Sequence, residues 1–287
     1  MSGAERSTAG VVSFGERLHR AVGDHGPVIA GVDPHASLLE AWSLPDTPEG
    51  LREFSRTTLA AVRGTVAAIK PQSAFYERHG SAGIAVLEEL LRAARELGVL
   101  TILDAKRGDI GSTMEAYAQS YLRPGAPLEA DAITVSPFLG TGSLDPATEL
   151  AAEHGKGLFL LALTSNPDGP QVQHARTAGD TPVALEIARH AERIGKAAPG
   201  EWSSVGLVVG ATVGDAYREL GLDRAAPSVP LLAPGFGAQG AGPAQLTEVF
   251  GESAGHVLVS LSRGLLAAGP DEASLRARAE ELQAAYS

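Results

Sequence analysis

Leu103-Asp104-Ala105-Lys106-Arg107-Gly108-Asp109-Ile110-Gly111-Ser112-Thr113 follows an apolar, β-branched run, 99–102, and leads into a segment compatible with a helix. Because side chains on a strand alternate between its two faces, we expect Asp104 and Lys106 on the same side at the strand exit. A second carboxylate, Asp109, follows on the loop. In a barrel of alternating strands and helices, this end of the strands carries the chemistry.

Similar runs recur along the chain, with helical periodicity between them. The eight predicted strands are 28–33, 66–71, 99–106, 132–136, 157–164, 205–212, 229–234 and 256–262. Most are continuously apolar, which is typical of parallel strands covered on both faces. Apolar stripes at helical spacing occur over 84–97 and 183–194, and Gly98 is placed where the first of these helices ends.

Two architectures alternate in this way, a (β/α)8 TIM barrel and a doubly wound open sheet. Polar residues at or just after the strand ends favour the barrel, since its strands converge on one mouth. These residues are Asp33, Lys70, Lys106, Ser136, Thr164 and Arg263. We therefore predict one TIM-barrel domain over 1–287, with a loose tail at 1–10, a helix at 11–24, the barrel at 28–264 and a closing helix at 270–286.

The composition excludes several classes of protein. The 287 residues are 44% hydrophobic and 20% charged, as in ordinary globular domains. The net charge of −11, without a basic cluster, argues against binding to nucleic acid or to anionic membranes. The absence of cysteine excludes disulfides and cysteine nucleophiles, and the scattered histidines predict no metal site. No apolar run approaches about 20 residues, so we expect a cytoplasmic protein without membrane spans.

The charged residues at neighbouring strand ends are the strongest candidates for chemistry. Asp104, Lys106 and Asp109, with Lys70, place two carboxylates and two ammonium groups together. Such a set either closes the barrel mouth as an ion-pair network or acts in catalysis. A lysine that forms a Schiff base must first lose its proton, whereas flanking carboxylates favour the charged form. Lys106 is therefore interpreted as a proton donor or an electrostatic partner for developing negative charge.

A phosphate site is predicted at the loops after the last two strands. Pro234-Gly235-Phe236-Gly237-Ala238-Gln239-Gly240-Ala241-Gly242 is rich in glycine, which lets backbone N–H groups approach an anion. Ser262 and Arg263 follow the last strand, and the arginine suits charge-assisted bonds to phosphate. These two loops are the usual phosphate site of TIM barrels, although a glycine-rich loop alone is equally an ordinary turn.

Three other strand exits each allow two interpretations. Asp33 either accepts hydrogen bonds from a hydroxyl group or caps a turn. Lys70 either faces the site or lies on the surface. Thr164-Ser165-Asn166-Pro167 either binds the polar edge of a ring or forms an Asn-Pro turn.

With these motifs the chain resembles the orotidine 5′-phosphate decarboxylase family, and most of all its bacterial subgroup of similar length (type 2). The run from Asp104 to Ile110 carries the likeness most specifically. The likeness continues, in the family's order, through 31–34, 70–72, 164–167, 234–240 and 262–264. It implies a TIM-barrel carboxy-lyase of pyrimidine biosynthesis that converts orotidine 5′-monophosphate (OMP) to UMP and CO2 without a metal or other cofactor.

The resemblance also implies roles at the reacting end of the substrate. By position, Lys106 donates a proton to C6 of the pyrimidine, and Asp104 lies near the departing carboxylate. Lys70 belongs to the same charged network and reaches the ribose. Asp33 binds a ribose hydroxyl.

Further implied roles concern the base, the phosphate and a second subunit. Thr164 or Ser165 faces the pyrimidine, while Asp109 and Thr113 enter the active site of a neighbouring subunit, which implies a homodimer with shared sites. The residues implied around the phosphate are Gly235, Gln239, Ser262 and Arg263. Some relatives carry arginine where this chain has Gly237, so Arg263 and Gln239 are expected to matter more for phosphate binding here.

Two rival hypotheses differ from the cofactor-free decarboxylase. One is a Mg²⁺-dependent sugar-phosphate decarboxylase or aldolase of the same superfamily, which shares an Asp-x-Lys-x-x-Asp pattern. The other is a non-catalytic barrel that binds a nucleotide through its phosphate. The first predicts loss of activity with a chelator, and the second predicts binding of UMP without turnover.

Overall fold

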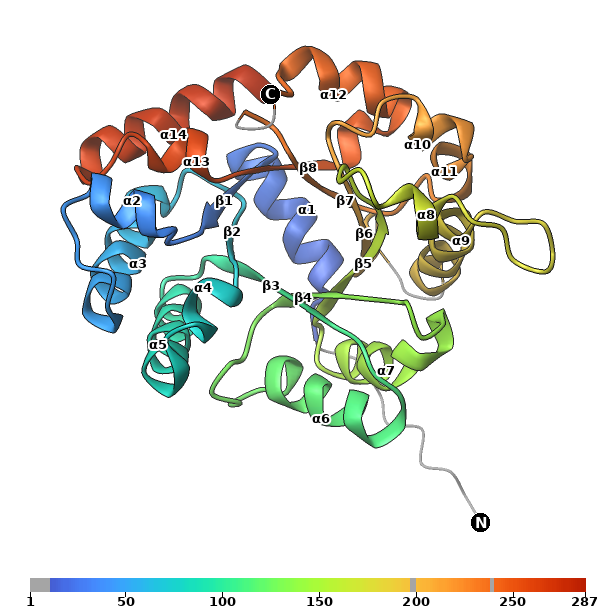
Figure 1. Cartoon of the computed structure of the whole chain (residues 1–287), viewed down its shortest axis with the longest axis horizontal. Helices are drawn as coiled ribbons and strands as arrows, with labels where there is room; N and C mark the ends of the chain where they lie inside the picture. Colours follow the sequence, from blue (N-terminus) through green and yellow to red (C-terminus); the bar gives the residue numbers. More distant parts are fainter. Residues whose placement is uncertain (1–10, 197–199, 238–239) are drawn as a thin grey trace.

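Eight parallel strands form a closed barrel in the order of the sequence (Figure 1). The computed structural model describes residues 11–196, 200–237 and 240–287, so the tail predicted at 1–10 lies outside the described residues. The strands are β1 (Val28–Val32), β2 (Ala68–Pro71), β3 (Leu100–Arg107), β4 (Ala132–Val135), β5 (Gly157–Leu163), β6 (Val205–Val209), β7 (Leu231–Pro234) and β8 (Val257–Leu261). Pairing of Val28 with Val259 joins β1 to β8. This closure confirms the TIM barrel and excludes the open sheet.

Helices connect successive strands on the outside of the barrel. They are α1 (Phe14–His25), α2 (Ala36–Ala41), α3 (Pro48–Val62), α4 (Ala74–Glu77), α5 (Gly80–Glu96), α6 (Gly111–Leu122), α7 (Asp145–Glu153), α8 (Pro170–Gln173), α9 (Val183–Lys196), α10 (Ala216–Glu219), α11 (Leu222–Ala225), α12 (Pro243–Phe250), α13 (Arg263–Leu266) and α14 (Glu272–Tyr286). Two 3-10 helices, η1 (Thr141–Leu144) and η2 (Gly251–His256), complete the elements. No helix in the described ranges combines the length and the apolar character needed to cross a bilayer.

Local capping explains where the predicted helices begin and end. The N-terminal helix begins at Phe14, because the Ser13 side chain accepts a hydrogen bond from the backbone N–H of Glu16. The closing helix begins at Glu272, after Asp271 caps it in the same way. Gly98 follows α5 with φ +71°, as predicted for a residue that ends a helix. Leu97, the last residue of the predicted stripe, lies beyond the helix and is 38% exposed.

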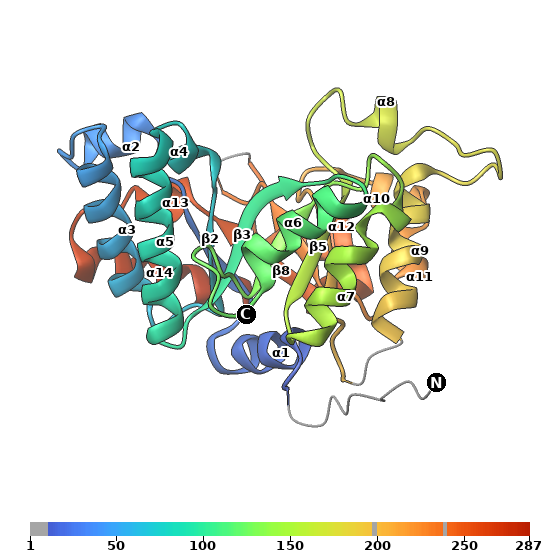
Figure 2. The same cartoon turned by 90° about the horizontal axis from the view of Figure 1, so that it is seen from below.

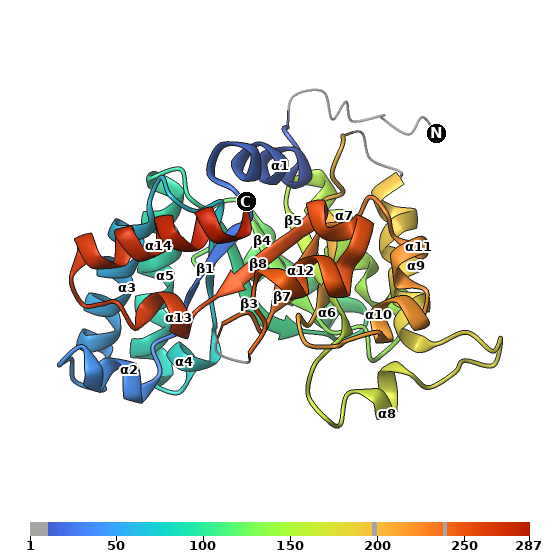
Figure 3. The ribbon, with the colours of Figure 1, turned by 90° about the horizontal axis from the view of Figure 1, so that it is seen from above.

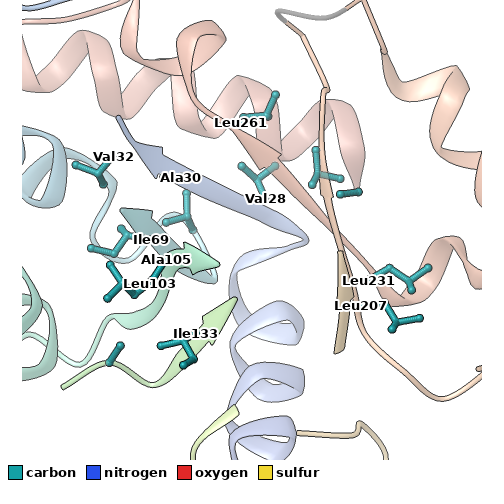
Figure 4. Close-up of a cluster of buried hydrophobic side chains, with 14 of the residues drawn as sticks. Val28, Ala30, Val32, Ile69, Leu103, Ala105, Ile133, Leu207, Leu231 and Leu261 are labelled. Atoms are coloured by element: carbon teal, nitrogen blue, oxygen red, sulfur yellow. The ribbon is translucent and has the colours of Figure 1, made fainter. Parts of the chain in front are cut away.

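The main hydrophobic core lies between the barrel and its helices. Outward-facing strand residues such as Ile69, Leu103 and Ile133 belong to it (Figure 4). A smaller core fills the lower part of the barrel, where Phe14 and Leu18 of α1 pack among inward-facing residues. Figures 2 and 3 show α1 lying across this end of the barrel, while α2, α4 and α8 lie toward the other end. Helix α1 therefore closes the end at which the strands begin.

Strand periodicity places polar residues directly above this inner core. Ala68, Ile102, Ala132 and Leu258 belong to the inner core, and two residues later their strands carry Lys70, Asp104, Thr134 and Ser260. Because two residues along a strand return to the same face, these polar side chains point into the upper half of the barrel. The lower interior of the barrel is therefore apolar, and the polar side chains of these strands lie toward the mouth, where the strands end.

Truncation of Phe14 tests whether α1 closes the barrel. Phe14 is fully buried, and its ring meets that of Phe159 edge-on with centroids 6.1 Å apart. Phe14→Ala should lower the free energy of unfolding by about 3–5 kcal/mol, as measured by urea denaturation. Val172→Ala, at a position that is 44% exposed, is the control and should change it by less than about 0.5 kcal/mol. Equal effects of the two variants would contradict the closing role of α1.

Candidate active site

A cavity of about 350 Å³ opens at the mouth of the barrel. It is lined by Asp33, His35, Lys70, Gln72, Ala74, Phe75, Pro234, Gly235, Phe236, Ser260, Ser262 and Arg263. These residues follow or end β1, β2, β7 and β8. A larger cavity of about 480 Å³ lies near α1, but its Arg17 is paired with Asp131 at 2.6 Å. The chemistry of the lining, and not the volume, therefore identifies the mouth as the candidate site.

The Asp104 carboxylate is the centre of a dense set of contacts at this mouth. Its Oδ2 accepts hydrogen bonds from Lys70 Nζ at 3.0 Å and from Gln72 Nε2 at 3.2 Å. Its Oδ1 accepts from Lys106 Nζ at 2.5 Å and from Thr134 Oγ1 at 2.9 Å. Both carboxylate oxygens are thus bound to one lysine and one neutral donor. The predicted neighbourhood of Asp104, Lys106 and Lys70 is confirmed.

Opposite charges hold this cluster in its ionised state. Burial alone would raise the pKa of the Asp104 carboxyl, but the ammonium groups of Lys70 and Lys106 lower it far below its usual range. Burial would likewise lower the pKa of Lys70, whereas the charges of Asp104 and Asp33 raise it above its usual value. Lys70 is 6% exposed, which excludes the alternative of a surface lysine. A buried carboxylate thus lies between two cations at the floor of the mouth.

Lys106 reaches Asp104 through an irregular backbone and not through regular alternation. Leu103 pairs with Ile133 but Arg107 pairs with Val135, so the register between β3 and β4 shifts between these pairs. Within this bulge Lys106 has φ +48°, a left-handed conformation that costs a non-glycine residue about 1–3 kcal/mol. The Lys106 side chain is 45% exposed, against 11% for Asp104. The ammonium group of Lys106 is therefore open to solvent, whereas the carboxylate it contacts is buried. Of this cluster, Lys70 and Gln72 line the cavity, and Asp104 and Lys106 lie directly behind them through their hydrogen bonds.

Two buried polar atoms in the cavity wall have no hydrogen-bond partner among the described residues. They are Asp33 Oδ1 and Ser262 Oγ. A Cβ on Gly31 would lie 2.7 Å from Ser262 Cβ and 3.2 Å from Asp33 Oδ2, so glycine is required between them. Buried polar groups are normally paired, and these two point to hydroxyl or phosphate groups of a ligand.

The predicted phosphate loops lie beside these two atoms. Gly235 lines the cavity with φ +113°, a conformation accessible to glycine. Arg263 lines it too, and its guanidinium group makes no hydrogen bond or ion pair with any other described residue. Gln239 lies outside the described residues. The described part of the predicted phosphate site therefore presents one guanidinium group that is available to an anion.

Thr164 and Ser165 do not line the cavity. The Thr164 hydroxyl accepts a bond from Gln173 Nε2 at 2.7 Å and donates to Asn166 Oδ1 at 2.6 Å. These contacts tie the loop after β5 to α8. Both predicted interpretations of this segment, a turn and a ring-binding loop, stay compatible with the contacts.

Asp109 and Thr113 lie away from the Asp104 cluster of their own chain. Asp109 Oδ1 accepts a bond from the backbone N–H of Ile110 at 2.8 Å, and Thr113 is exposed on the first turn of α6. Neither residue lines the cavity. Of the four predicted catalytic residues, one chain thus brings together Lys70, Asp104 and Lys106.

Sequence reasoning missed several residues that the barrel brings to the site. Gln72 and Thr134 each donate a hydrogen bond to the Asp104 carboxylate. His35 and Phe75 lie in the cavity wall, and the centroids of their rings are 4.1 Å apart. The position of Gln72 just after a strand was an available signal. Thr134 lies inside the strand predicted at 132–136, and only its register against β3 reveals its partner.

The acid sensitivity of the fold tests the charge state of Asp104. Its pKa is lower in the folded chain than in the unfolded chain, so its charge stabilises the fold above the ordinary aspartate pKa of about 3.9. That contribution is lost as the pH falls below this value. Asp104→Asn should therefore lose less unfolding free energy than the parent between about pH 5 and pH 3, as measured by urea denaturation. Parallel losses in the two proteins would contradict the assignment.

Known proteins resemble this chain over nearly its whole length. A profile of the Orotidine 5'-phosphate decarboxylase / HUMPS family matches residues 26–278. The orotidine 5′-phosphate decarboxylase of Salinispora arenicola is 53% identical over 272 residues, which cover 95% of this chain and 96% of that protein. The enzyme of that name from Streptomyces coelicolor is 53% identical over 270 residues, which cover 93% and 94%.

A solved structure supports the likeness in three dimensions. The crystal structure of a putative orotidine 5′-phosphate decarboxylase from Streptomyces avermitilis superimposes with a TM-score of 0.91 at 51% sequence identity. The match covers 96% of this chain and 95% of that one. The barrel, its charged mouth and these similarities lead to one conclusion: the chain belongs to the orotidine 5′-phosphate decarboxylase / HUMPS family.

Proposed function

We propose that this chain decarboxylates OMP to UMP and CO2 without a metal or organic cofactor. The observation that carries the proposal is the contact of one buried carboxylate, Asp104, with two lysines, of which Lys70 lines the open cavity. The family and the names of the relatives support the same reaction. We also propose that the enzyme acts in the cytoplasm.

The cavity supplies complementary groups for a nucleoside monophosphate. Arg263, Ser262 and the backbone at Gly235 line the cavity and bind the phosphate. The proposal adds Gln239, which lies outside the described residues. Asp33 Oδ1 accepts a hydrogen bond from a ribose hydroxyl, and Lys70 reaches the same sugar. The pyrimidine faces Thr164 or Ser165. The Thr164 hydroxyl can donate to the base only after it releases Asn166, whereas its oxygen keeps one lone pair that can accept a hydrogen bond from the base. Phosphate binding then contributes to the rate by holding the remote end of the substrate in place.

The reaction breaks the bond between C6 and the substrate carboxylate, and the electron pair stays on C6. The ammonium of Lys106 stabilises this charge and then transfers a proton from Nζ to C6. Asp104 lies beside the departing carboxylate and repels it, while it also holds Lys106 in place. Lys70 keeps Asp104 ionised through the step. The neutral amine left on Lys106 regains its proton from solvent after CO2 has left.

Asp109 and Thr113 complete the site of a second subunit in this proposal. Within one chain they do not line the cavity, and large apolar residues after the same two strands are exposed. Ile110 is 62%, Phe138 75% and Leu139 53% exposed. These residues follow β3 and β4, whose exit loops touch: a Cβ on Gly108 would lie 2.4 Å from the Ser136 carbonyl oxygen. An exposed apolar patch of this kind suits a homodimer interface.

Removal of the proton donor tests the catalytic proposal. Lys106→Ala should reduce kcat by at least about 10²- to 10⁴-fold, because the other ammonium beside Asp104 among the described residues, that of Lys70, is buried and is held on the opposite carboxylate oxygen. The decrease in absorbance near the orotate band measures turnover. Lys196→Ala, which removes a lysine paired with Glu192 on α9, is the matched control and should leave turnover unchanged.

The same assay separates the rival functions. Turnover should persist in EDTA, and its loss there would favour the Mg²⁺-dependent rival. Binding of UMP by the parent protein without any release of CO2 would establish the non-catalytic barrel. Near-normal turnover of Lys106→Ala would refute the assigned proton donor.

Mixed dimers test whether the sites are shared. After random reassociation of Asp109→Ala with Lys106→Ala, half of the dimers carry both subunits, and one of their two sites is intact. Activity should therefore return to about a quarter of the parent value, because each site of a two-fold dimer takes residues from both chains. A mixture of Asp104→Ala with Lys106→Ala is the control and should stay inactive, since these residues act within one subunit. No recovery in dimers shown to be mixed would contradict shared sites.

A further inference from the structure

One buried hydroxyl, that of Thr134 on β4, contacts both the main chain of Lys106 and the side chain of Asp104. Thr134 is 1% exposed. Its Oγ1 accepts a hydrogen bond from the backbone N–H of Lys106 at 2.9 Å and donates one to Asp104 Oδ1 at 2.9 Å. Lys106 Nζ binds the same Oδ1 at 2.5 Å. The three residues thus form a closed ring of hydrogen bonds that joins the backbone of Lys106 to its own ammonium group.

The ring occurs where the backbone is least regular. The register between β3 and β4 shifts around Lys106, and Lys106 itself has φ +48°. In a regular parallel pair, a backbone N–H here would bond to a carbonyl oxygen of the neighbouring strand. In the bulge a side-chain hydroxyl takes that place. Conformations of this kind persist only where the surroundings hold them.

We propose that Thr134 is a positioning residue for decarboxylation, which sets the left-handed conformation of Lys106 and so places its ammonium over Asp104. The inference rests on the proposed function, in which Lys106 is the proton donor. Threonine suits the task because its hydroxyl accepts from the N–H and donates to the carboxylate at the same time. Valine has nearly the same shape but can do neither.

Thr134 also matters after the proton has moved. When Lys106 gives its proton to C6, Asp104 Oδ1 loses its charged donor, while the Thr134 hydroxyl continues to donate to it. Lys70 and Gln72 meanwhile hold Oδ2. The carboxylate therefore keeps its orientation through the step, and Lys106 can recover its proton in the same place.

The proposal predicts a selective effect on the chemical step. Thr134 does not line the cavity, so the groups that bind phosphate and ribose are unaffected. Thr134→Val should lower kcat by about 10- to 100-fold, the size expected when a reacting group is misplaced by about 1 Å. The KM for OMP and the Kd for UMP should change by less than about threefold, and Thr134→Ser should restore kcat to within about threefold of the parent.

A second buried threonine provides a matched control. Thr101 lies in β3 and is 2% exposed, and its Oγ1 donates to Asp131 Oδ2 at 3.1 Å outside the catalytic cluster. Thr101→Val therefore removes a similar bond and should leave kcat unchanged. If Thr134→Val does not fold, Thr134→Ala supplies the same test, with kcat expressed per folded site by titration with UMP.

A parallel assay of Lys106→Ala distinguishes a failure of the positioning role of Thr134 from a failure of the proposed function. If Lys106→Ala is inactive while Thr134→Val keeps kcat within about threefold of the parent, the positioning role is overturned and the proposed function stands. Equal impairment of Thr134→Ser and Thr134→Val would also overturn it, because the hydroxyl would then not be the decisive group. Near-normal turnover of Lys106→Ala would instead remove the proposed function on which the inference rests.

Discussion

The contact between Asp104 and its two lysines is the interaction on which the rest of the site depends. A carboxylate as buried as that of Asp104 is costly to ionise alone, and an ammonium as buried as that of Lys70 is also costly. The attraction between the two charges offsets the cost of burying each of them, and Lys106 adds a second positive charge from the solvent-exposed side of Asp104. Because Lys70 already neutralises Asp104, the ammonium of Lys106 is the part of the cluster that a reaction can use.

The barrel makes this cluster possible by separating apolar and polar layers. Helix α1 and the inner core fill the end where the strands begin, so the interior of the barrel is apolar there and its polar side chains lie toward the opposite mouth. Two residues further along the strands, the apolar layer of Ala68, Ile102 and Ala132 gives way to polar side chains. Because residues two apart on a strand face the same side, an apolar residue and the polar residue two positions later lie at successive heights inside the barrel.

Most of the fold and part of the site could be predicted because they depend on local periodicity. Eight apolar runs with helices between them indicate parallel strands, and polar residues after those runs indicate a common mouth. Asp104, Lys106 and Lys70 were predictable in this way. The contact of Thr134 with Asp104 was not predictable, since it depends on which residues stand opposite across a strand pair. The position of Gln72 after a strand indicated the mouth but not its partner. The irregular φ of Lys106 has no signal in residue type, because lysine does not favour that conformation.

The sequence by itself determined the eight strand–helix units, the mouth as the site of chemistry and the residue types that face it. These follow from hydrophobic period and from the order of polar residues along the chain, which are local properties. Only the tertiary structure decided that the sheet closes between β1 and β8, that Lys70 is buried, and that Lys106 reaches Asp104 from a bulge. These features depend on register between strands far apart in sequence, and register is set by the packing of the whole barrel.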